Sequence, residues 1–245
     1  MPKSITNTKT SGLTFASIVV AIGLAIGGYF IGSGVYRSLA RRTVTVKGLA
    51  EMDVTADLAI WNLKVSRSGT DLIAIQKEID ADIIKVKNFL KSAGFKDDEL
   101  QNQRISVQNE YTPIVSGKRP PQRYSIGTGV TVRSADVNRV DATSRRMGEI
   151  VRQGIKISED YRGPSYIFNG LNDIKIPMIE KATKNATDAG KQFAKDANTS
   201  LGKIQSANQG VFSIDARDQT SDWTAEKESI HKKVRVVSTI TFYLK

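Results

Sequence analysis

Cysteine is absent from this chain of 245 residues, and histidine occurs once, at His231. Without cysteine the chain cannot form a disulfide, a thiolate nucleophile, a cysteine-ligated zinc site or an iron–sulfur cluster. A single histidine also excludes a metal centre built from several imidazole rings, and it restricts any serine–histidine mechanism to one ring. The low proline content excludes proline-rich architecture, whereas 40% hydrophobic residues suffice for a packed core.

Positive charge is concentrated at the amino end of the chain. The formal net charge is +11, and residues 1–42 hold five basic residues and no acidic one. The rest of the chain therefore carries only +6. The basic pairs Arg145-Arg146 and Lys232-Lys233 have no interleaved aromatic residues, so we expect them to face solvent. We predict no nucleic-acid partner.

An apolar, charge-free segment spans residues 13–35, between an amino-terminal tail (1–12) and a basic linker (36–42). As an α-helix rising about 1.5 Å per residue, it would extend over about 34 Å, which exceeds the roughly 30 Å hydrocarbon layer of a bilayer. The sequence therefore predicts one transmembrane helix, with the lipid bilayer as a partner. The side chains expected to anchor it include Leu13, Ile22, Leu24, Phe30 and Val35.

Two questions about this segment stay open. A cleaved signal peptide is the alternative interpretation, with Ser38 and Ala40 as a small-x-small cleavage site, but its apolar region usually spans only about 7 to 15 residues. Basic residues flank the segment on both sides, so the charge distribution does not favour export of the body. Arg37, Arg41 and Arg42 also offer a contact to anionic lipid.

From residue 43 onward, the period of the apolar residues alternates between two and about 3.6. It predicts strands near residues 43–48, 54–69, 105–111, 124–132, 155–169, 203–214 and 234–244, and helices over 71–93, 136–153 and 174–197. Thr70 and Gly94 are expected to cap the first helix, and Pro177 is expected in the first turn of the third. The order β-β-α-β-β-α-β-α-β-β indicates an α+β fold, a mainly antiparallel sheet with helices packed on one face. We interpret residues 43–245 as one domain.

Few residues of this domain suggest chemistry. The acidic residues 97–99 lack the pattern of a calcium loop and are expected to form a solvated turn, and His231 is expected to be an exposed structural residue. Gly127-Thr128-Gly129 lies within a strand and lacks the remaining features of a nucleotide loop. We therefore predict no metal site, no cofactor and no catalytic residue.

Aromatic residues suggest core positions and one contact surface. Trp61, Tyr111 and Tyr124 are expected in the core. Trp223 lies in the polar segment 215–229, where an apolar ring favours contact with a neighbouring subunit or with the bilayer. Trp223 is therefore the candidate interface residue.

Much of residues 43–245 resembles one known family. The resemblance is carried by RYSIGTGVTVRSADVNRV (123–140), by GPSYIFNGLNDIKIPMIEKATKNATDAGKQFAKD (163–196), and by LGKIQSANQGVF (201–212). These segments are similar to the SIMPL domain family, which includes bacterial periplasmic immunogenic proteins. The resemblance implies an exported envelope protein with an α+β domain, sometimes assembled into ring-like homo-oligomers and associated with oxidative or envelope stress. It implies no catalytic residues.

Together these features predict a non-enzymatic envelope protein, anchored by a single pass in the bacterial inner membrane with its carboxy-terminal domain in the periplasm. We expect it to form homo-oligomers through sheet edges and loops. The alternative is a small-molecule-binding module or enzyme, with a pocket between the helices and the small-residue face of strand 124–132.

Overall fold

The structure is a computed structural model that describes residues 20–30, 42–109, 124–159, 163–218 and 225–245. The chain forms two compact units, each assembled from separate segments. The first unit comprises residues 1–48, 185–208 and 239–245, and the second comprises residues 49–184 and 209–238. The interpretation of residues 43–245 as one domain stays a prediction.

Two antiparallel sheets and several helices confirm the predicted α+β class. The four-stranded sheet has the order β1-β10-β8, and a further strand, β9, pairs with β10. These strands are β1 (Thr43–Thr55), β8 (Leu201–Gln209), β9 (Ser213–Ala216) and β10 (His231–Leu244). The six-stranded sheet has the order β3-β5-β2-β6, in which β4 also pairs with β5 and β7 with β2. These strands are β2 (Leu58–Gly69), β3 (Leu100–Asn102), β4 (Ser106–Asn109), β5 (Tyr124–Ser134), β6 (Ile157–Glu159) and β7 (Ser165–Ile167).

The presence of two sheets, where the sequence predicted one, has a local cause at Ala56 and Asp57. The amide of Ala56 donates to the carbonyl of Ile230, and the amide of Asp57 donates to that of Ile167. The Asp57 carboxylate accepts hydrogen bonds from the amides of Asn169 and Gly170 at 2.9 and 3.1 Å. These bonds end β1, and the chain then enters β2 with new strand partners.

The first unit has a small core of its own. Val46, Ile240 and Phe242 on the strands pack against Ala186 of helix α5 (Leu171–Asp196). A small residue on the helix permits this close packing, because a Cβ at Gly190 of α5 would lie 3.2 Å from the Leu201 side chain and 3.4 Å from the Phe242 ring. The predicted break at Lys47-Gly48 is wrong, since β1 continues through both residues to Thr55.

Helix α5 also contributes to a core in the second unit. Met178 and Ala182 contact Ala50, Val234 and Val236 there. Leu171 and Ile174 pack against the same cluster, so tertiary packing extends the start of the helix to Leu171. Pro177 therefore lies in the second turn, and its predicted place in the first turn is wrong.

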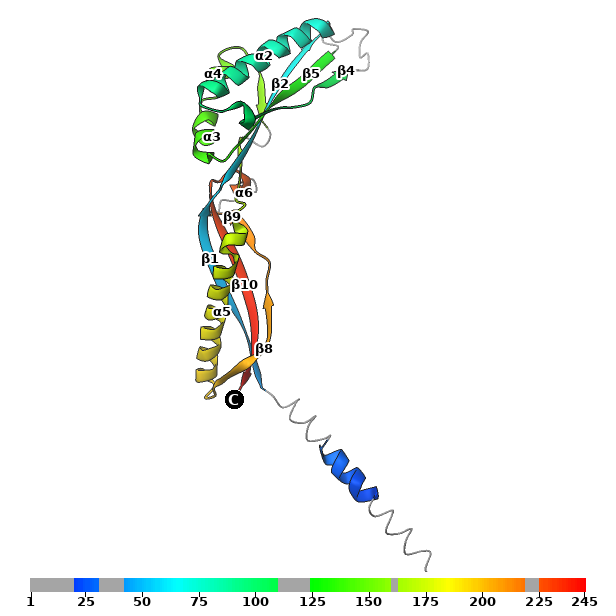
Figure 1. Cartoon of the computed structure of the whole chain (residues 1–245), viewed down its shortest axis with the longest axis vertical. Coiled ribbons are helices and arrows are strands. Elements are labelled where there is room, and N and C mark those ends of the chain that lie inside the picture. Colours follow the sequence, from blue (N-terminus) through cyan, green and yellow to red (C-terminus); the bar gives the residue numbers. More distant parts are fainter. Residues whose placement is uncertain (1–19, 31–41, 110–123, 160–162, 219–224) are drawn as a thin grey trace, which may run out of the picture. The chain divides into compact units, whose positions relative to one another are not determined.

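Helix α2 (Leu72–Ser92) covers one face of the six-stranded sheet, as Figure 1 shows. Its buried side chains include Val86 and Leu90, which pack in the main core with Trp61 and Leu63. The predicted helix and core position of Trp61 are confirmed. The predicted cap is wrong, because Asp71 and not Thr70 accepts the amide hydrogens of Ile73 and Ala74. Gly94 ends the helix with φ of +91°, as expected.

The second predicted helix is divided into α3 (Val137–Ser144) and α4 (Gly148–Val151). Arg139 of α3 connects several elements on this side of the sheet. Its guanidinium donates to a Glu99 carboxylate oxygen and to the Gly94 carbonyl, each at 2.6 Å, and lies over the Phe95 ring. Glu99 ends the short 3-10 helix η1 (Asp97–Glu99). The acidic cluster is therefore a turn in which two residues form ion pairs, Glu99 with Arg139 and the exposed Asp97 with Lys91.

Candidate functional site

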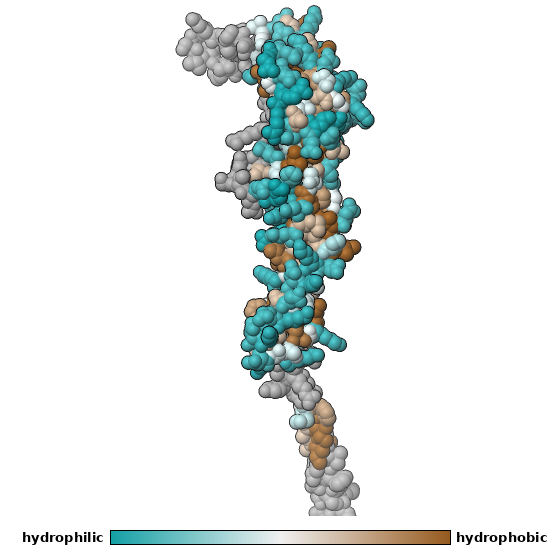
Figure 2. Space-filling view, turned by 90° about the vertical axis from the view of Figure 1, so that its left-hand side faces the viewer, coloured by the Kyte–Doolittle hydropathy of each residue, from teal (hydrophilic) through white to brown (hydrophobic). Residues whose placement is uncertain are grey.

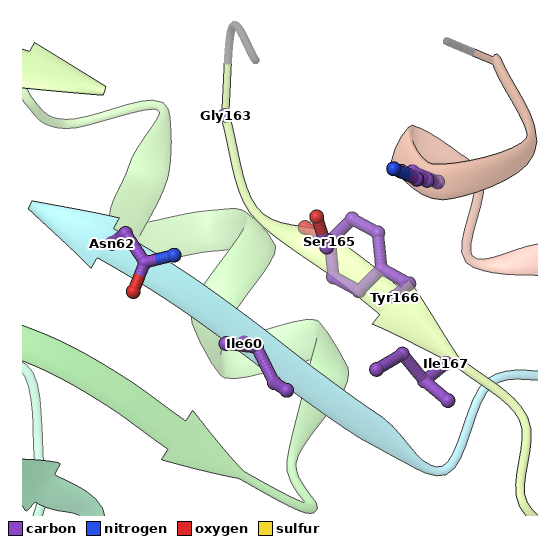
Figure 3. Close-up of a pocket in the computed structure, with 7 residues that line it drawn as sticks. Ile60, Asn62, Gly163, Ser165, Tyr166 and Ile167 are labelled. Atoms are coloured by element: carbon purple, nitrogen blue, oxygen red, sulfur yellow. The ribbon is translucent and has the colours of Figure 1, made fainter. Parts of the chain in front are cut away.

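The face of the six-stranded sheet opposite α2 is the candidate functional site, and we call it the outer face. Residues along a strand alternate between the two faces of a sheet. On β2, Trp61, Leu63 and Val65 are fully buried on the helix side. Asn62 and Lys64 alternate with them and therefore belong to the outer face. In Figure 3 the side chains of Ile60 and Asn62 project from β2, with helices behind the strand.

Strand register aligns small and polar residues across the middle of this face. Ser66 of β2 pairs with Gly127 of β5, and Gly127 also pairs with Ser106 of β4. In the adjacent row Lys64 pairs with Gly129. Because Gly127 has no side chain, the sheet surface is hollowed here, and the hollow has a volume of about 370 Å³. We call it the glycine hollow. It lies opposite α2, so the predicted pocket between the helices and this glycine face is wrong.

A hydrogen-bonded network borders the glycine hollow. The Gln103 side-chain amide donates to the Thr131 hydroxyl at 3.0 Å, and that hydroxyl donates to the Asn62 amide oxygen at 2.7 Å. Gly129 makes room for Gln103, since a Cβ there would lie 2.8 Å from the Gln103 Oε1 atom and 2.1 Å from the Leu63 carbonyl oxygen. The amide of Gln103 also donates to the Gly129 carbonyl at 2.9 Å. These bonds fix the backbone next to Arg104.

A second hollow, of about 270 Å³, lies between β2, β7 and helix α6 (Ala225–Glu228). Figure 3 shows Ile60 and Ile167 from neighbouring strands at its base. Asn62, Ser165 and Lys227 add polar groups to its lining. The lining therefore combines apolar and polar side chains.

Tyr166 also lines this second hollow, although its side chain is mostly buried. Its hydroxyl donates to the Asp141 carboxylate at 3.4 Å, and Arg145 donates to the same carboxylate at 3.0 and 3.2 Å. Burial raises the pKa of Tyr166 far above its ordinary value, and the Asp141 carboxylate raises it further. The phenol is therefore neutral at physiological pH and acts as a hydrogen-bond donor.

The predicted anchor is described only in part. Residues 20–30 form a helix in which Ile22, Leu24 and Phe30 are exposed, and Leu24 is 73% exposed. Figure 2 shows this helix as an apolar surface. Leu13 and Val35 lie outside the described residues, as does Trp223, the candidate interface residue. Within the ranges that the structure describes, no helix is both long and apolar enough to cross a membrane.

The remaining candidates divide between exposed and buried positions. His231 is exposed at the start of β10, as expected. Lys232 was expected to face solvent, and this prediction is wrong because Lys232 is 3% exposed and donates from Nζ to the Glu226 carbonyl. Burial lowers the pKa of Lys232, whereas the charge of Glu226 raises it. Among the described residues, no three His, Asp or Glu side chains are grouped as a metal site.

The sequence identified only part of the outer face. Gly127 and Gly129 were noted as a small face, but Gln103, Arg104, Ser106 and Ser66 were missed. Gln103 and Arg104 lie outside the strands and Ser106 lies on a strand of only 4 residues. The register that brings Ser106 and Ser66 beside the same glycine is a property of the sheet. No local sequence pattern marks the interruption at residues 103–105, between β3 and β4.

These features define an α+β protein with two antiparallel sheets, an exposed apolar helix near its amino end and a polar, hollowed sheet face. The chain belongs to the SIMPL family, described as a protein of unknown function (DUF541), whose family model matches residues 44–242.

Named relatives agree with this membership. The 26 kDa periplasmic immunogenic proteins of Brucella melitensis biotype 1 and Brucella abortus (strain S19) are each 25% identical to this chain over 215 residues, which cover 81% of this chain and 79% of theirs. The uncharacterized protein YggE of Edwardsiella ictaluri is 21% identical over 189 residues, covering 74% of each chain. The predicted family is thereby confirmed, and the relatives from Brucella are periplasmic by name.

Proposed function

We propose that this chain is a non-enzymatic structural protein of the cell envelope, anchored by its amino-terminal helix and self-associating through its folded body. The observation that supports the anchor is the exposure of apolar side chains on the helix of residues 20–30. Leu24 is 73% exposed and Phe30 is 69% exposed. Burying such surface in lipid gains roughly 25 cal/mol per Å². This helix belongs to the charge-free segment 13–35, whose length suits a bilayer.

The location that we propose is the inner membrane, with the folded body in the periplasm. The periplasmic names of the Brucella relatives support this orientation. The basic residues flanking the apolar segment do not oppose it strongly, because long domains translocate largely regardless of their charge. By the same family relationship we propose a role in envelope or oxidative stress.

Self-association is supported by the edges of the four-stranded sheet. β1 and β8 are its end strands, and residues 203–209 of β8 are all exposed, including Ile204. An end strand presents unpaired backbone groups that a second chain can bind. Tethering to a membrane raises the effective concentration of copies, so weak edge contacts suffice for assembly.

A non-enzymatic role is supported by the chemistry of the outer face. Its central network consists of the Asn62 and Gln103 amides and the Thr131 hydroxyl. These groups neither gain nor lose a proton near neutral pH, so they are suited to binding and not to general acid–base catalysis.

The anchor is tested by fractionating cells that produce the full chain. We expect the wild type in the membrane fraction and a chain without residues 1–42 in the aqueous fraction. Leu24→Arg should weaken membrane retention, because an arginine at the centre of such a helix costs about 2.5–3.5 kcal/mol. Ile73→Arg is the matched control, since Ile73 is similarly exposed on α2. Intact full-length chain in the aqueous fraction without detergent would contradict the proposal.

Orientation and assembly need separate measurements. Protease should digest the body in spheroplasts but not in intact cells. In mild detergent, the mass of the full chain should exceed that of a monomer, and Ile204→Lys should lower it. Gln205→Lys on the same strand introduces the same charge without removing an apolar side chain, and serves as the control. A monomer at high protein concentration, for the wild type, would refute self-association.

A further inference from the structure

The glycine hollow has the composition of an anion site. Lys64 and Arg104 contribute positive charge to its lining, and Ser66 and Ser106 contribute hydroxyl groups. None of the described residues that line it is acidic. Arginine, lysine and hydroxyl donors are the groups that proteins use most often to hold phosphate.

Strand register places the two serines on opposite sides of the hollow. Ser66 and Ser106 both pair with Gly127, on its two neighbouring strands. Adjacent strands are about 4.8 Å apart, so the serine backbones lie roughly 10 Å from each other across the glycine. This gap, together with a volume of about 370 Å³, is sufficient for a phosphate group and the small molecule attached to it.

Arg104 is positioned to serve such a ligand. Its neighbour Gln103 is held by backbone and side-chain hydrogen bonds to β5, which fix the start of the Arg104 backbone. The Arg104 side chain is exposed, and within the described part of the chain it has no ion-pair partner. Among the described residues, therefore, nothing holds its guanidinium in an ion pair.

From this geometry we propose that the glycine hollow binds a phosphate ester, held by Arg104, Lys64 and the hydroxyls of Ser66 and Ser106. The proposal is independent of the anchor and of self-association. A solvent-open site of this kind should bind inorganic phosphate with a dissociation constant on the order of 1 mM. Binding should weaken as sodium chloride is added, because exposed charges are screened.

The test uses the full chain in nonionic detergent, with the backbone amide signal of Ser106 followed by NMR. Inorganic phosphate and glucose 6-phosphate are the soluble probes. Phosphatidylglycerol, compared with phosphatidylcholine, is added to the micelles as the lipid probe. A saturable shift with the soluble probes identifies a free phosphate ester as the ligand, and a shift with phosphatidylglycerol alone identifies a lipid headgroup. No saturable shift with any of these probes would overturn the proposal.

Two variants locate the binding. Arg104→Gln should weaken it roughly tenfold, since a charge-assisted hydrogen bond is lost. Arg133→Gln is the matched control, because Arg133 is also exposed without an ion-pair partner among the described residues but lies outside the lining. Equal loss in both variants would indicate only general charge attraction and would overturn the site.

Gly127→Val fills the hollow without disturbing the fold. A Cβ at Gly127 meets only the Val65 carbonyl oxygen, at 4.0 Å, and valine favours strands. We expect loss of phosphate binding with an unchanged circular dichroism spectrum. Wild-type binding by this variant would also overturn the proposal, and if it fails to fold, the comparison of Arg104→Gln with Arg133→Gln still decides.

Discussion

The two faces of the six-stranded sheet differ although they share the same strands. On the inner face, Trp61, Leu63 and Val65 of β2 are fully buried against helices. On the outer face of the same strand, Asn62 bonds to neighbouring polar side chains and Ser66 borders a hollow. Burial of apolar side chains on the inner face therefore stabilises the fold. The outer face contributes less to stability and can be specialised for binding.

The largest effect should follow from damage to the inner face. Leu63→Ala removes a side chain with no exposed surface and leaves a cavity beneath α2. We expect the free energy of unfolding to fall by about 2–5 kcal/mol. Urea denaturation followed by circular dichroism measures this loss.

Ser66→Ala provides the comparison on the outer face. Ser66 lies three residues along the same strand, and its replacement should change stability by less than about 0.5 kcal/mol. If the two variants lost similar stability, the distinction between the faces would be wrong.

The two glycines of the outer face sharpen the comparison within that face. At Gly129 a Cβ would lie 2.1 Å from the Leu63 carbonyl oxygen, whereas at Gly127 the nearest atom is 4.0 Å away. Gly129→Ala should therefore destabilise the protein by about 1–3 kcal/mol through strain. Gly127→Ala should be neutral or slightly stabilising. Thermal unfolding of both variants tests this, and a neutral Gly129→Ala would mean that β2 and β5 separate at little cost.

Sequence reasoning predicted the inner face well because it obeys a simple period. The apolar residues of α2 recur every three or four positions, and these include the buried Ile75, Ile79, Val86 and Leu90. The class, the main helices and the core position of Trp61 followed from that pattern. Nothing in one strand, however, says which of its faces a helix will cover. That is why the glycines at 127 and 129 were noticed but assigned to the wrong side.

Other errors arose where tertiary contacts override a local pattern. β1 continues through Lys47-Gly48 because its buried side holds the small residues Gly48 and Ala50, which a search for large apolar residues overlooks. Lys232 looked like a surface charge, but it is buried and its ammonium group donates to the Glu226 carbonyl. Glu226 is only 6 residues from Lys232, but the period of the apolar residues does not show that the chain folds back between them.

A charged pair also contributes to the inner side of the sheet, and it should have a smaller effect. Burial alone would raise the pKa of Glu99, but hydrogen bonds from the Lys96 amide and Ser134, with the charge of Arg139, lower it below the ordinary 4.5. A lowered carboxyl pKa stabilises the fold above the unfolded value, and this contribution is lost as the pH falls through the folded value.

Glu99→Gln should therefore cost roughly 1 kcal/mol at neutral pH. The difference from the wild type should begin to shrink below about pH 4.5, where the unfolded chain binds the proton, and should be lost as the pH falls through the lower pKa of Glu99 in the folded protein. Urea denaturation at several pH values measures it. A difference that stays constant from neutral to acid pH would mean that apolar contacts alone hold the inner side.

Among the buried side chains compared with Leu63, the smallest effect is expected at Tyr166, which also lines the second hollow. Its hydroxyl is 3.4 Å from Asp141, so Tyr166→Phe removes a long hydrogen bond and should cost less than about 0.5–1 kcal/mol at neutral pH. Because burial and Asp141 raise the pKa of Tyr166, the neutral phenol stabilises the fold below the unfolded value of about 10, and this contribution declines above it. The stability of the wild type should consequently decrease more steeply than that of Tyr166→Phe above pH 10. Denaturation in alkaline buffers measures both stabilities. If the wild type and Tyr166→Phe lost stability equally above pH 10, the ring would be accessible to water and would belong to the outer face.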